Sequence, residues 1–325
     1  MKSIQVRDSS PDKDLVIADV AEPDCGNDQV LIEVYAAGVN RADIMQRAGK
    51  YPPPPGASPI LGLEVAGIVR RVGDAVTGIS PGERVCALLA GGGYAELVAV
   101  PHAQVMRLPP SISFEEGAGL PEAFITAFLN LFVEGGLQRG EIVLIHGGSS
   151  GVGTAAIQLA RTSGVHVACT VGNEEKKKAC EALGAEAVVN YKTEDFLSKL
   201  SARYPHGINL ILDCVGGEYL ERNVALLAPG GRLVMIASMG GAKGILDIPS
   251  LMKKRARIIG SVLRSRSDEE KGRITQLFQE RFMQQIASRH IRVVVDSVVP
   301  FAKVELAHQK MQSSEHIGKI VLHVK

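Results

Sequence analysis

The stretch His146-Gly147-Gly148-Ser149-Ser150-Gly151-Val152-Gly153 follows an apolar run at 141–145 and leads into a segment with helical periodicity at 152–163. Glycines let the backbone turn sharply and approach a pyrophosphate closely. A helix that starts directly after such a turn offers free amide groups and the positive end of its dipole to the anion. The stretch therefore predicts a strand–turn–helix unit that binds a dinucleotide, in a modified glycine pattern with Ser150 at the second glycine position.

Strand and helix patterns alternate regularly from residue 141 onward. This alternation is typical of a parallel sheet joined by crossover helices, and six strands make a complete doubly wound nucleotide-binding domain. The clearest helices are expected at 151–163 and 174–183. We assign residues 120–265 to this domain. The expected strands span residues 141–146, 165–171, 186–189, 208–213, 231–237 and 257–262.

The residues before this domain have a different pattern. Short strand patterns at 29–35, 62–69 and 94–100 are separated by turns rich in Gly and Pro. The run at 52–56, Pro-Pro-Pro-Pro-Gly, excludes a helix or a central strand because proline has no amide donor. This part of the chain is therefore expected to be mainly β.

Capping-box spacing, a Ser with a Glu three residues later, occurs at Ser113 and at Ser267. It predicts a helix start at each position, and the second helix should run to about Ser288. Two short strand patterns follow it, with no seventh strand–helix unit. We therefore assign residues 1–119 and 266–325 to one β-rich domain, with the nucleotide-binding domain inserted into it and a cleft between the two.

Charge and cysteine content exclude several partners. Lys plus Arg (36) nearly balance Asp plus Glu (35), and aromatic residues make up 4% with no Trp, which argues against a nucleic-acid or membrane-surface partner. The five cysteines form no CxxC pair, as expected for reduced thiols in a cytosolic protein. The first residues lack the apolar core of a signal peptide, so a cytoplasmic protein is expected.

The end of the second predicted strand bears on the choice of cofactor. NAD sites usually place an acid there to bind the ribose hydroxyl, but 167–173 contains none, and Glu174 and Glu175 are expected to begin the next helix. Lys176, one turn into that helix, can reach a 2′-phosphate, and such a contact contributes about 1.5–3 kcal/mol. The pattern favours NADPH; the alternative is that Lys176 is an ordinary solvent-exposed lysine.

Several segments together give the chain a resemblance that covers nearly its whole length. They include Asn40-Arg41-Ala42-Asp43, Gly62-Leu63-Glu64-Val65-Ala66-Gly67, Asn190-Tyr191, Asp213-Cys214-Val215-Gly216-Gly217 and Ile317-Gly318-Lys319-Ile320-Val321. With the glycine turn, these segments resemble the quinone oxidoreductase (zeta-crystallin-like) branch of the medium-chain dehydrogenase/reductase superfamily, and most of all its tumour-suppressor-inducible, NADPH-dependent group. The resemblance implies an α/β protein with a GroES-like β-rich catalytic domain and a doubly wound Rossmann domain with a six-stranded parallel sheet.

The resemblance also implies roles for individual residues. Asn40 and Thr126 would lie beside the nicotinamide, and Tyr51 would face the substrate. Asn173 departs from the small hydroxyl residue often found at its position, which weakens one phosphate contact. The implied cofactor-binding residues, from the pyrophosphate through the 2′-phosphate to the nicotinamide half, are Ser150, Gly151, Val152, Gly172, Asn173, Lys176, Tyr191, Val215, Met239, Leu263 and Lys319.

Zinc-dependent alcohol dehydrogenases share the expected fold, so this sequence must be compared with their metal ligands. A catalytic zinc needs three protein ligands with N or S donors favoured, and Leu63 stands where those enzymes have a His. Four closely spaced cysteines for a structural zinc are also missing. His308 and His316 are close in sequence, but we interpret them as surface or satisfied residues. We therefore expect no metal.

The predicted activity is zinc-independent hydride transfer from NADPH to a quinone. Hydrogen bonds from Tyr51, Asn40 or a water would stabilise the negative charge that develops on the acceptor, although Tyr51 could equally be a packing wall. Two alternatives stay open: reduction of an alkenal or enoyl double bond with the same cofactor, and a non-enzymatic role in NADPH-regulated RNA binding.

Three further expectations concern charged residues and assembly. Asp43 is interpreted as an ion-pair partner of Arg41 rather than an acid–base group. Glu64, on an apolar strand, is either buried and satisfied or oriented toward the cleft. The apolar strand at 258–263 would end the sheet with an exposed edge, and edge pairing between two copies would form a homodimer.

Overall fold

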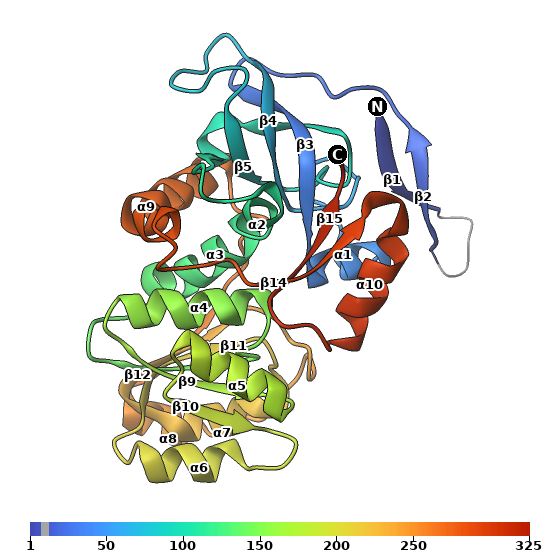
Figure 1. The fold of residues 1–325 in the computed structure, drawn as a ribbon. Helices are drawn as coiled ribbons and strands as arrows, with labels where there is room; N and C mark the ends of the chain where they lie inside the picture. Colours follow the sequence, from blue (N-terminus) through green and yellow to red (C-terminus); the bar gives the residue numbers. More distant parts are fainter. Residues whose placement is uncertain (8–12) are drawn as a thin grey trace. The chain divides into compact units, whose positions relative to one another are not determined.

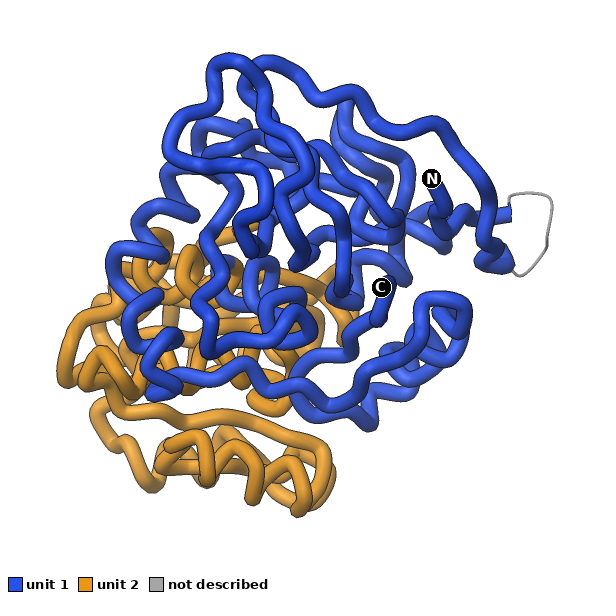
Figure 2. Tube along the Cα trace, turned by 45° about the horizontal axis from the view of Figure 1, so that its top comes forward, with its two compact units in different colours: residues 1–125, 264–325 blue, residues 126–263 orange. Residues whose placement is uncertain are grey.

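The structure is a computed structural model that describes residues 1–7 and 13–325, and these residues form two compact units (Figure 2). Unit 1 comprises Met1–Ile125 and Arg264–Lys325, and unit 2 comprises Thr126–Leu263. The sequence analysis placed the domain boundaries after residues 119 and 265, and these boundaries remain a prediction. The compact units divide after residues 125 and 263.

Unit 2, in which every residue is described, is built on a six-stranded parallel sheet of order β10-β9-β8-β11-β12-β13 (Figure 1). The first strand of the unit lies in the middle of the sheet and the chain winds outward in both directions, which is the doubly wound order. The predicted α/β fold class is confirmed. The strands are β8 (Ile142–His146), β9 (His166–Val171), β10 (Ala187–Asn190), β11 (Ile208–Asp213), β12 (Leu227–Met235) and β13 (Arg257–Gly260).

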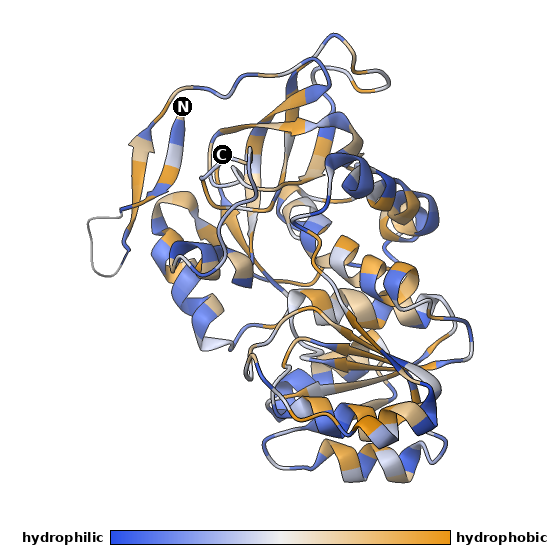
Figure 3. Ribbon diagram, turned by 180° about the vertical axis from the view of Figure 1, so that it is seen from behind, coloured by the Kyte–Doolittle hydropathy of each residue, from blue (hydrophilic) through white to orange (hydrophobic). Residues whose placement is uncertain are grey.

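The helices of unit 2 fall into two groups. The first pair pack against each other and against β8 to β10, while the remaining three pack in sequence from β10 to β12. Because helices cover the sheet, its strands are mostly apolar, as the orange over much of them in Figure 3 shows. The helices are α4 (Gly151–Thr162) and α5 (Glu174–Leu183), then α6 (Phe196–Arg203), α7 (Tyr219–Leu226) and α8 (Ile248–Lys254).

Two predicted strands of unit 2 differ from the structure by more than one residue at an end. Strand β12 begins at Leu227 instead of 231, because the pairing with β11 shifts register and Gly230 takes a φ of +75°, so the Pro-Gly-Gly run is an irregularity inside the strand. Strand β13 ends at Gly260 instead of 262, although Ser261 still donates its amide to Met235 O.

In unit 1, a seven-stranded sheet of order β14-β15-β3-β4-β5-β7, with β6 also paired to β3, is formed by the described residues. Strand β15 pairs antiparallel with β3, so the two segments of the chain that form unit 1 share one sheet. A separate hairpin precedes it. The strands are β1 (Lys2–Val6), β2 (Leu15–Asp19), β3 (Gln29–Val39), β4 (Glu64–Val72), β5 (Arg84–Leu88), β6 (Leu97–Pro101), β7 (Val105–Arg107), β14 (Val295–Pro300) and β15 (Lys319–His323).

The helices of unit 1 include the two predicted from capping boxes. Ser113 Oγ accepts from the Glu116 amide, and Ser267 Oγ accepts from the Glu270 amide. No helix within residues 1–7 and 13–325 is both long and apolar enough to cross a bilayer. The remaining helical segments of the chain are α1 (Arg41–Arg47), η1 (His102–Gln104), α2 (Phe114–Ala118), α3 (Pro121–Phe128), η2 (Leu129–Glu134), α9 (Asp268–Ala287), η3 (Phe301–Lys303) and α10 (Val304–Ser313).

Candidate active site

The glycine-rich turn joins β8 to α4 as predicted. Ser150 is the N-cap of α4, and its Oγ accepts the Gly153 amide at 3.0 Å. Gly147 takes a φ of +71°, and the Ser150 amide donates back to Gly147 O at 3.0 Å, which closes the turn. The N-terminus of a twelve-residue helix is therefore held open at the turn, in the arrangement that suits an anion.

Close packing explains why glycine is needed at two places in this turn. A Cβ on Gly153 would lie 2.3 Å from Gly147 O and 2.6 Å from Gly148 O. A Cβ on Gly148 would lie 2.7 Å from the Cys169 sulfur on β9. The helix can thus approach the turn, and the turn can approach the second strand, only without side chains at these positions.

A buried network of hydrogen bonds joins the strand end that precedes the turn to neighbouring segments of unit 2. The two ring nitrogens of His146 lie 3.0 Å from Thr170 Oγ1 and 2.8 Å from Asn223 Oδ1. Asn223 Nδ2 donates to Asp213 Oδ2 at 3.2 Å, and Asp213 Oδ1 accepts the Val215 amide at 2.7 Å. Burial lowers the pKa of His146, against the opposing effect of the Asp213 carboxylate. A neutral histidine therefore ties the end of β8 to the loop after β11, and sequence reasoning missed this link.

The residues predicted to hold the 2′-phosphate gather at the end of β9. Asn173 is the N-cap of α5 and accepts the Lys176 amide at 2.9 Å, so Glu174 and Glu175 begin the helix as expected. The Tyr191 hydroxyl would lie 2.8 Å from a Cβ on Gly172. The half-buried Lys176 thus shares one corner of unit 2 with Gly172, Asn173 and Tyr191.

The residues predicted to contact the nicotinamide half lie on two neighbouring loops and beyond β13. The Met239 amide donates to Cys214 O at 3.2 Å, which joins the loop of Val215 to that of Met239. Met239 is 59% exposed, whereas Leu263 is buried. Thr126 is the first residue of unit 2, is half-buried, and accepts Asn130 Nδ2 through its carbonyl at 2.7 Å.

In unit 1, Asn40 belongs to a buried ion-pair cluster. Lys319 Nζ lies 2.6 Å from Glu64 Oε1 and donates to Asn40 Oδ1 at 2.6 Å and to Val39 O at 3.0 Å. Asn40 Nδ2 donates to Glu64 Oε1 at 2.9 Å. Lys319 thus has three oxygen partners, one for each N–H of its ammonium group. This arrangement indicates that Lys319 fixes the positions of Asn40 and Glu64. Its contact with a cofactor stays a prediction.

Asp43 is a structural residue with partners that the sequence did not indicate. Its fully buried carboxylate accepts the Asn40 and Gly62 amides at 2.8 and 3.1 Å and the Tyr94 hydroxyl at 3.1 Å. Burial raises its pKa to about 6, opposed mainly by the two backbone hydrogen bonds. The Arg41 guanidinium donates to Ser314 Oγ instead, so the expected ion pair with Arg41 is replaced by a cap of α1.

Tyr51 is half-buried in the loop after α1, beside two charged residues. Burial raises its pKa, the nearby Glu122 carboxyl raises it further, and Arg264 lowers it. Burial and the neighbouring Glu64 carboxylate raise the pKa of Glu122 to about 8, and within the described residues its Oε2 is buried without a hydrogen-bond partner. Sequence reasoning missed Glu122; an acid at a helix start inside an apolar stretch was the available signal.

Comparisons with known proteins identify the family of the chain. Residues 26–110 match the alcohol dehydrogenase GroES-like domain family, and residues 151–280 match the zinc-binding dehydrogenase family. The quinone oxidoreductase of Mus musculus is 34% identical over 312 residues, which cover 94% of this chain and 92% of the relative. The chain belongs to the quinone oxidoreductase branch of the medium-chain dehydrogenase/reductase superfamily. It is therefore an oxidoreductase.

Solved structures of this superfamily share the whole fold. The Escherichia coli quinone oxidoreductase, solved in complex with NADPH, has a TM-score of 0.87 and 27% identity, with all of both chains covered. The CurK enoyl reductase has a TM-score of 0.86 and 26% identity, covering 100% of this chain and 99% of that one. The fold is thus shared by quinone and enoyl reductases.

The residues weighed above as metal ligands are Leu63, His308 and His316. Leu63 is buried in the core, and His308 lies against the Tyr94 hydroxyl at 3.3 Å. Burial lowers the pKa of His308 to about 4, which keeps it neutral. His316 is also buried, so neither histidine lies on the surface. Residues 1–7 and 13–325 contain no group of three or more His, Cys, Asp or Glu that could hold a metal ion.

Proposed function

We propose that this protein reduces quinones by hydride transfer from NADPH, without a catalytic zinc. The observation that carries the proposal is the 34% identity with a quinone oxidoreductase over 94% of the chain. The open N-terminus of α4 and the closely packed glycines fit the pyrophosphate of a nicotinamide dinucleotide. When bound, the cofactor supplies the hydride.

All the proposed cofactor contacts except Lys319 lie in unit 2. The amides of Gly151 and Val152 and the hydroxyl of Ser150 bind the pyrophosphate. Two further sets of residues would bind the 2′-phosphate and the nicotinamide half of the cofactor. The 2′-phosphate lies among Gly172, Asn173, Lys176 and Tyr191, and the nicotinamide half is held by Val215, Met239 and Leu263, with Thr126 and Lys319 as the further predicted contacts.

Tyr51 and Asn40 are proposed to stabilise the negative charge that develops on the acceptor. Asn40 is well suited because Lys319 holds its Oδ1 and Glu64 accepts one of its two Nδ2 hydrogens, which fixes the amide while leaving the second hydrogen to donate. Tyr51 is protonated at neutral pH, as a tyrosine normally is, and burial raises its pKa further. Hydrogen-bond donors fixed before the reaction stabilise such charge without reorganisation.

Zinc independence is proposed from the residues and from the chemistry of the acceptor. A buried Leu63 has no atom that can ligate a metal. A quinone is already electrophilic and accepts hydride without the Lewis acid that alcohol oxidation requires. The protein then needs mainly to bind both reactants and hold them about 3–3.5 Å apart.

The test is cofactor oxidation followed spectroscopically with NADPH or NADH and a panel of ortho-quinones, para-quinones and conjugated enals. Faster quinone reduction with NADPH, unchanged by a chelator, supports the whole proposal. NADPH oxidation with enals but with no quinone moves the function to double-bond reduction. That second candidate is favoured by the shared fold of the CurK enoyl reductase.

Replacing Lys176 by alanine should raise the dissociation constant for NADPH by roughly tenfold to hundredfold and leave that for NADH unchanged, since only NADPH carries the 2′-phosphate. Fluorescence titration with each cofactor measures the change. Lys178→Ala, an exposed lysine on the same helix, is the matched control. An equal rise in the dissociation constants for NADPH and NADH would show that Lys176 does not contact the 2′-phosphate.

We also propose that two copies pair through β13. This strand ends the sheet of unit 2, so one of its sides has no partner strand in that sheet, and Val262 just beyond it is 48% exposed. An exposed edge of this kind is usually covered or paired. Sedimentation at micromolar concentration tests the proposal, and a monomer would contradict it.

A further inference from the structure

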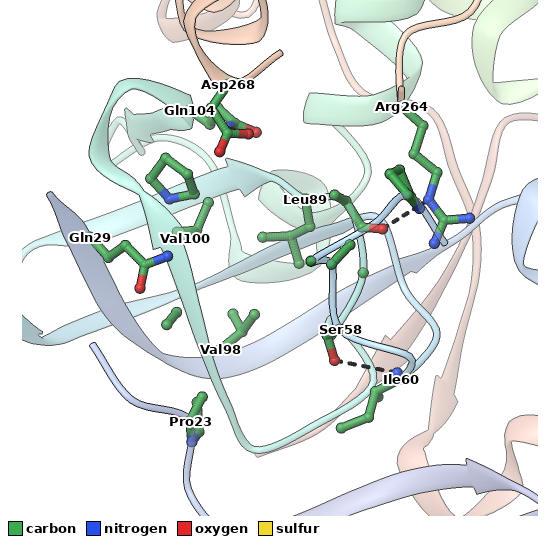
Figure 4. A pocket seen from close by; sticks show the side chains of 18 of the residues that line it. Pro23, Gln29, Ser58, Ile60, Leu89, Val98, Val100, Gln104, Arg264 and Asp268 are labelled. Carbon is green, nitrogen blue, oxygen red and sulfur yellow. Dashed lines mark hydrogen bonds between the residues drawn. The ribbon is translucent and has the colours of Figure 1, made fainter. Parts of the chain in front are cut away.

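Arg264 is a buried cation whose hydrogen bonds all go to neutral oxygens. It is 3% exposed, and its Nε donates to Ala90 O at 2.8 Å, its Nη2 to Gln46 Oε1 at 2.7 Å and its Nη1 to Tyr51 O at 3.4 Å. Its side chain lies at the edge of a pocket of about 770 Å³ in unit 1 (Figure 4).

The three acceptors come from three separate segments of unit 1. Gln46 lies near the end of α1, Tyr51 lies in the proline-rich loop that follows, and Ala90 lies in the loop after β5. The chain from Ala48 to Leu63 forms neither helix nor strand. Ile60 and Leu61, near its end, accept the amides of Gly92 and Tyr94, whereas the backbone hydrogen bond described between residues 51 and 58 is the local one from the Ala57 amide to Pro54 O. Arg264 therefore supplies contacts that fix the position of this loop at Tyr51.

The same guanidinium also lies against the Tyr51 side chain. Its central carbon is 5.2 Å from the ring centroid, within the range of a cation–π contact. Backbone and ring of Tyr51 are thus held by one group. A planar fork of donors suits this task, because a lysine ammonium can neither span the three acceptors nor stack on the ring.

We propose that Arg264 is a positioning residue that holds the Tyr51 hydroxyl ready to donate to the acceptor oxygen. This inference rests on the proposed function, and it names the residue through which Tyr51 would act. Arg264 does not itself touch the reactants. Its loss should therefore affect catalysis only while Tyr51 carries its hydroxyl.

A double-mutant cycle tests this dependence. Arg264→Met and Tyr51→Phe should each lower kcat for the quinone by about tenfold, the scale of one well-placed hydrogen bond, while the NADPH dissociation constant stays within about twofold. The double variant should be no slower than Tyr51→Phe alone. Arg266→Met, which removes the neighbouring arginine and its ion pair with Glu270, is the matched control and should keep wild-type turnover.

The pH profile gives a readout that a purely structural role would not move. The charged groups that face Tyr51 are Arg264, which lowers the tyrosine pKa, and Glu122, which raises it. Tyr51 donates only while protonated, so turnover falls as pH rises through its pKa. Without the cation that pKa is higher, and the alkaline limb of the Arg264→Met profile should shift to higher pH.

The outcomes separate the inference from the proposed function. If the wild-type protein reduces quinones but the losses of Arg264→Met and Tyr51→Phe multiply in the double variant, Arg264 does not act through Tyr51. If the wild-type protein oxidises NADPH with no quinone, the proposed function is wrong and this inference falls with it. Where Arg264→Met does not fold, Arg264→Lys repeats the cycle, with the same non-additivity expected.

Discussion

Replacing Lys319 by methionine should lower the free energy of unfolding by about 3–5 kcal/mol, because it leaves a buried carboxylate without its cation. Glu64 is fully buried and the Lys319 side chain is 4% exposed, so water cannot compensate. Urea unfolding at pH 7, compared with the wild-type protein, measures the loss. Turnover should fall as well, since Asn40 Oδ1 loses its 2.6 Å contact.

Two further variants serve as controls for Lys319→Met. The double variant Lys319→Met with Glu64→Gln should recover part of the lost stability, because it removes both members of the buried pair. Lys325→Met breaks an exposed ion pair with Glu33 and should change stability little. A loss no larger for Lys319→Met than for Lys325→Met would mean that the buried cluster does not stabilise the fold.

Replacing Gly153 by alanine should raise the NADPH dissociation constant roughly tenfold or more, through an overpacking cost of about 1–3 kcal/mol. The added Cβ would lie 2.3 Å from Gly147 O and 2.6 Å from Gly148 O, both backbone atoms of the turn. Alanine favours a helix over glycine, but the contact must push the turn and α4 apart. Cofactor titration and the melting temperature measure the two effects.

Gly260→Ala is the matched control in the same unit. A Cβ there would meet no atom within 4 Å, so affinity and melting temperature should both stay near wild-type values. Unchanged NADPH affinity in Gly153→Ala, with a lowered melting temperature, would show that the pyrophosphate does not bind at this turn.

Local patterns allowed much of unit 2 to be predicted. The turn at His146–Gly153 and the helix that begins at Glu174 depend on neighbours a few residues away, and each forms as expected. The strand bounds at β12 and β13 were less well predicted. The Pro-Gly-Gly run fits inside β12 because the pairing of β12 with β11 shifts register there. That pairing joins distant segments, so the local sequence does not reveal where β12 begins.

The contacts that complete the candidate site in unit 1 join distant residues. Glu64 meets Lys319 because β15 returns beside β3, and Tyr51 meets Arg264 because the chain re-enters unit 1 after Leu263. The interpretation of Asp43 as a partner of Arg41 was wrong for the same reason. Residues two positions apart on a helix do not face each other, and the partners of Asp43 include Gly62 and Tyr94.

The amino-acid sequence by itself determined the fold class, the glycine-rich turn and the family, because these follow from short-range periodicity, glycine and capping positions and motif spacing. Only the tertiary structure decided which charges are buried together, as at Lys319 and Glu64, and which side chain holds Tyr51. Burial and pairing depend on the packing of segments far apart in the chain. No local pattern encodes the free energy of a desolvated ion pair or of a buried guanidinium.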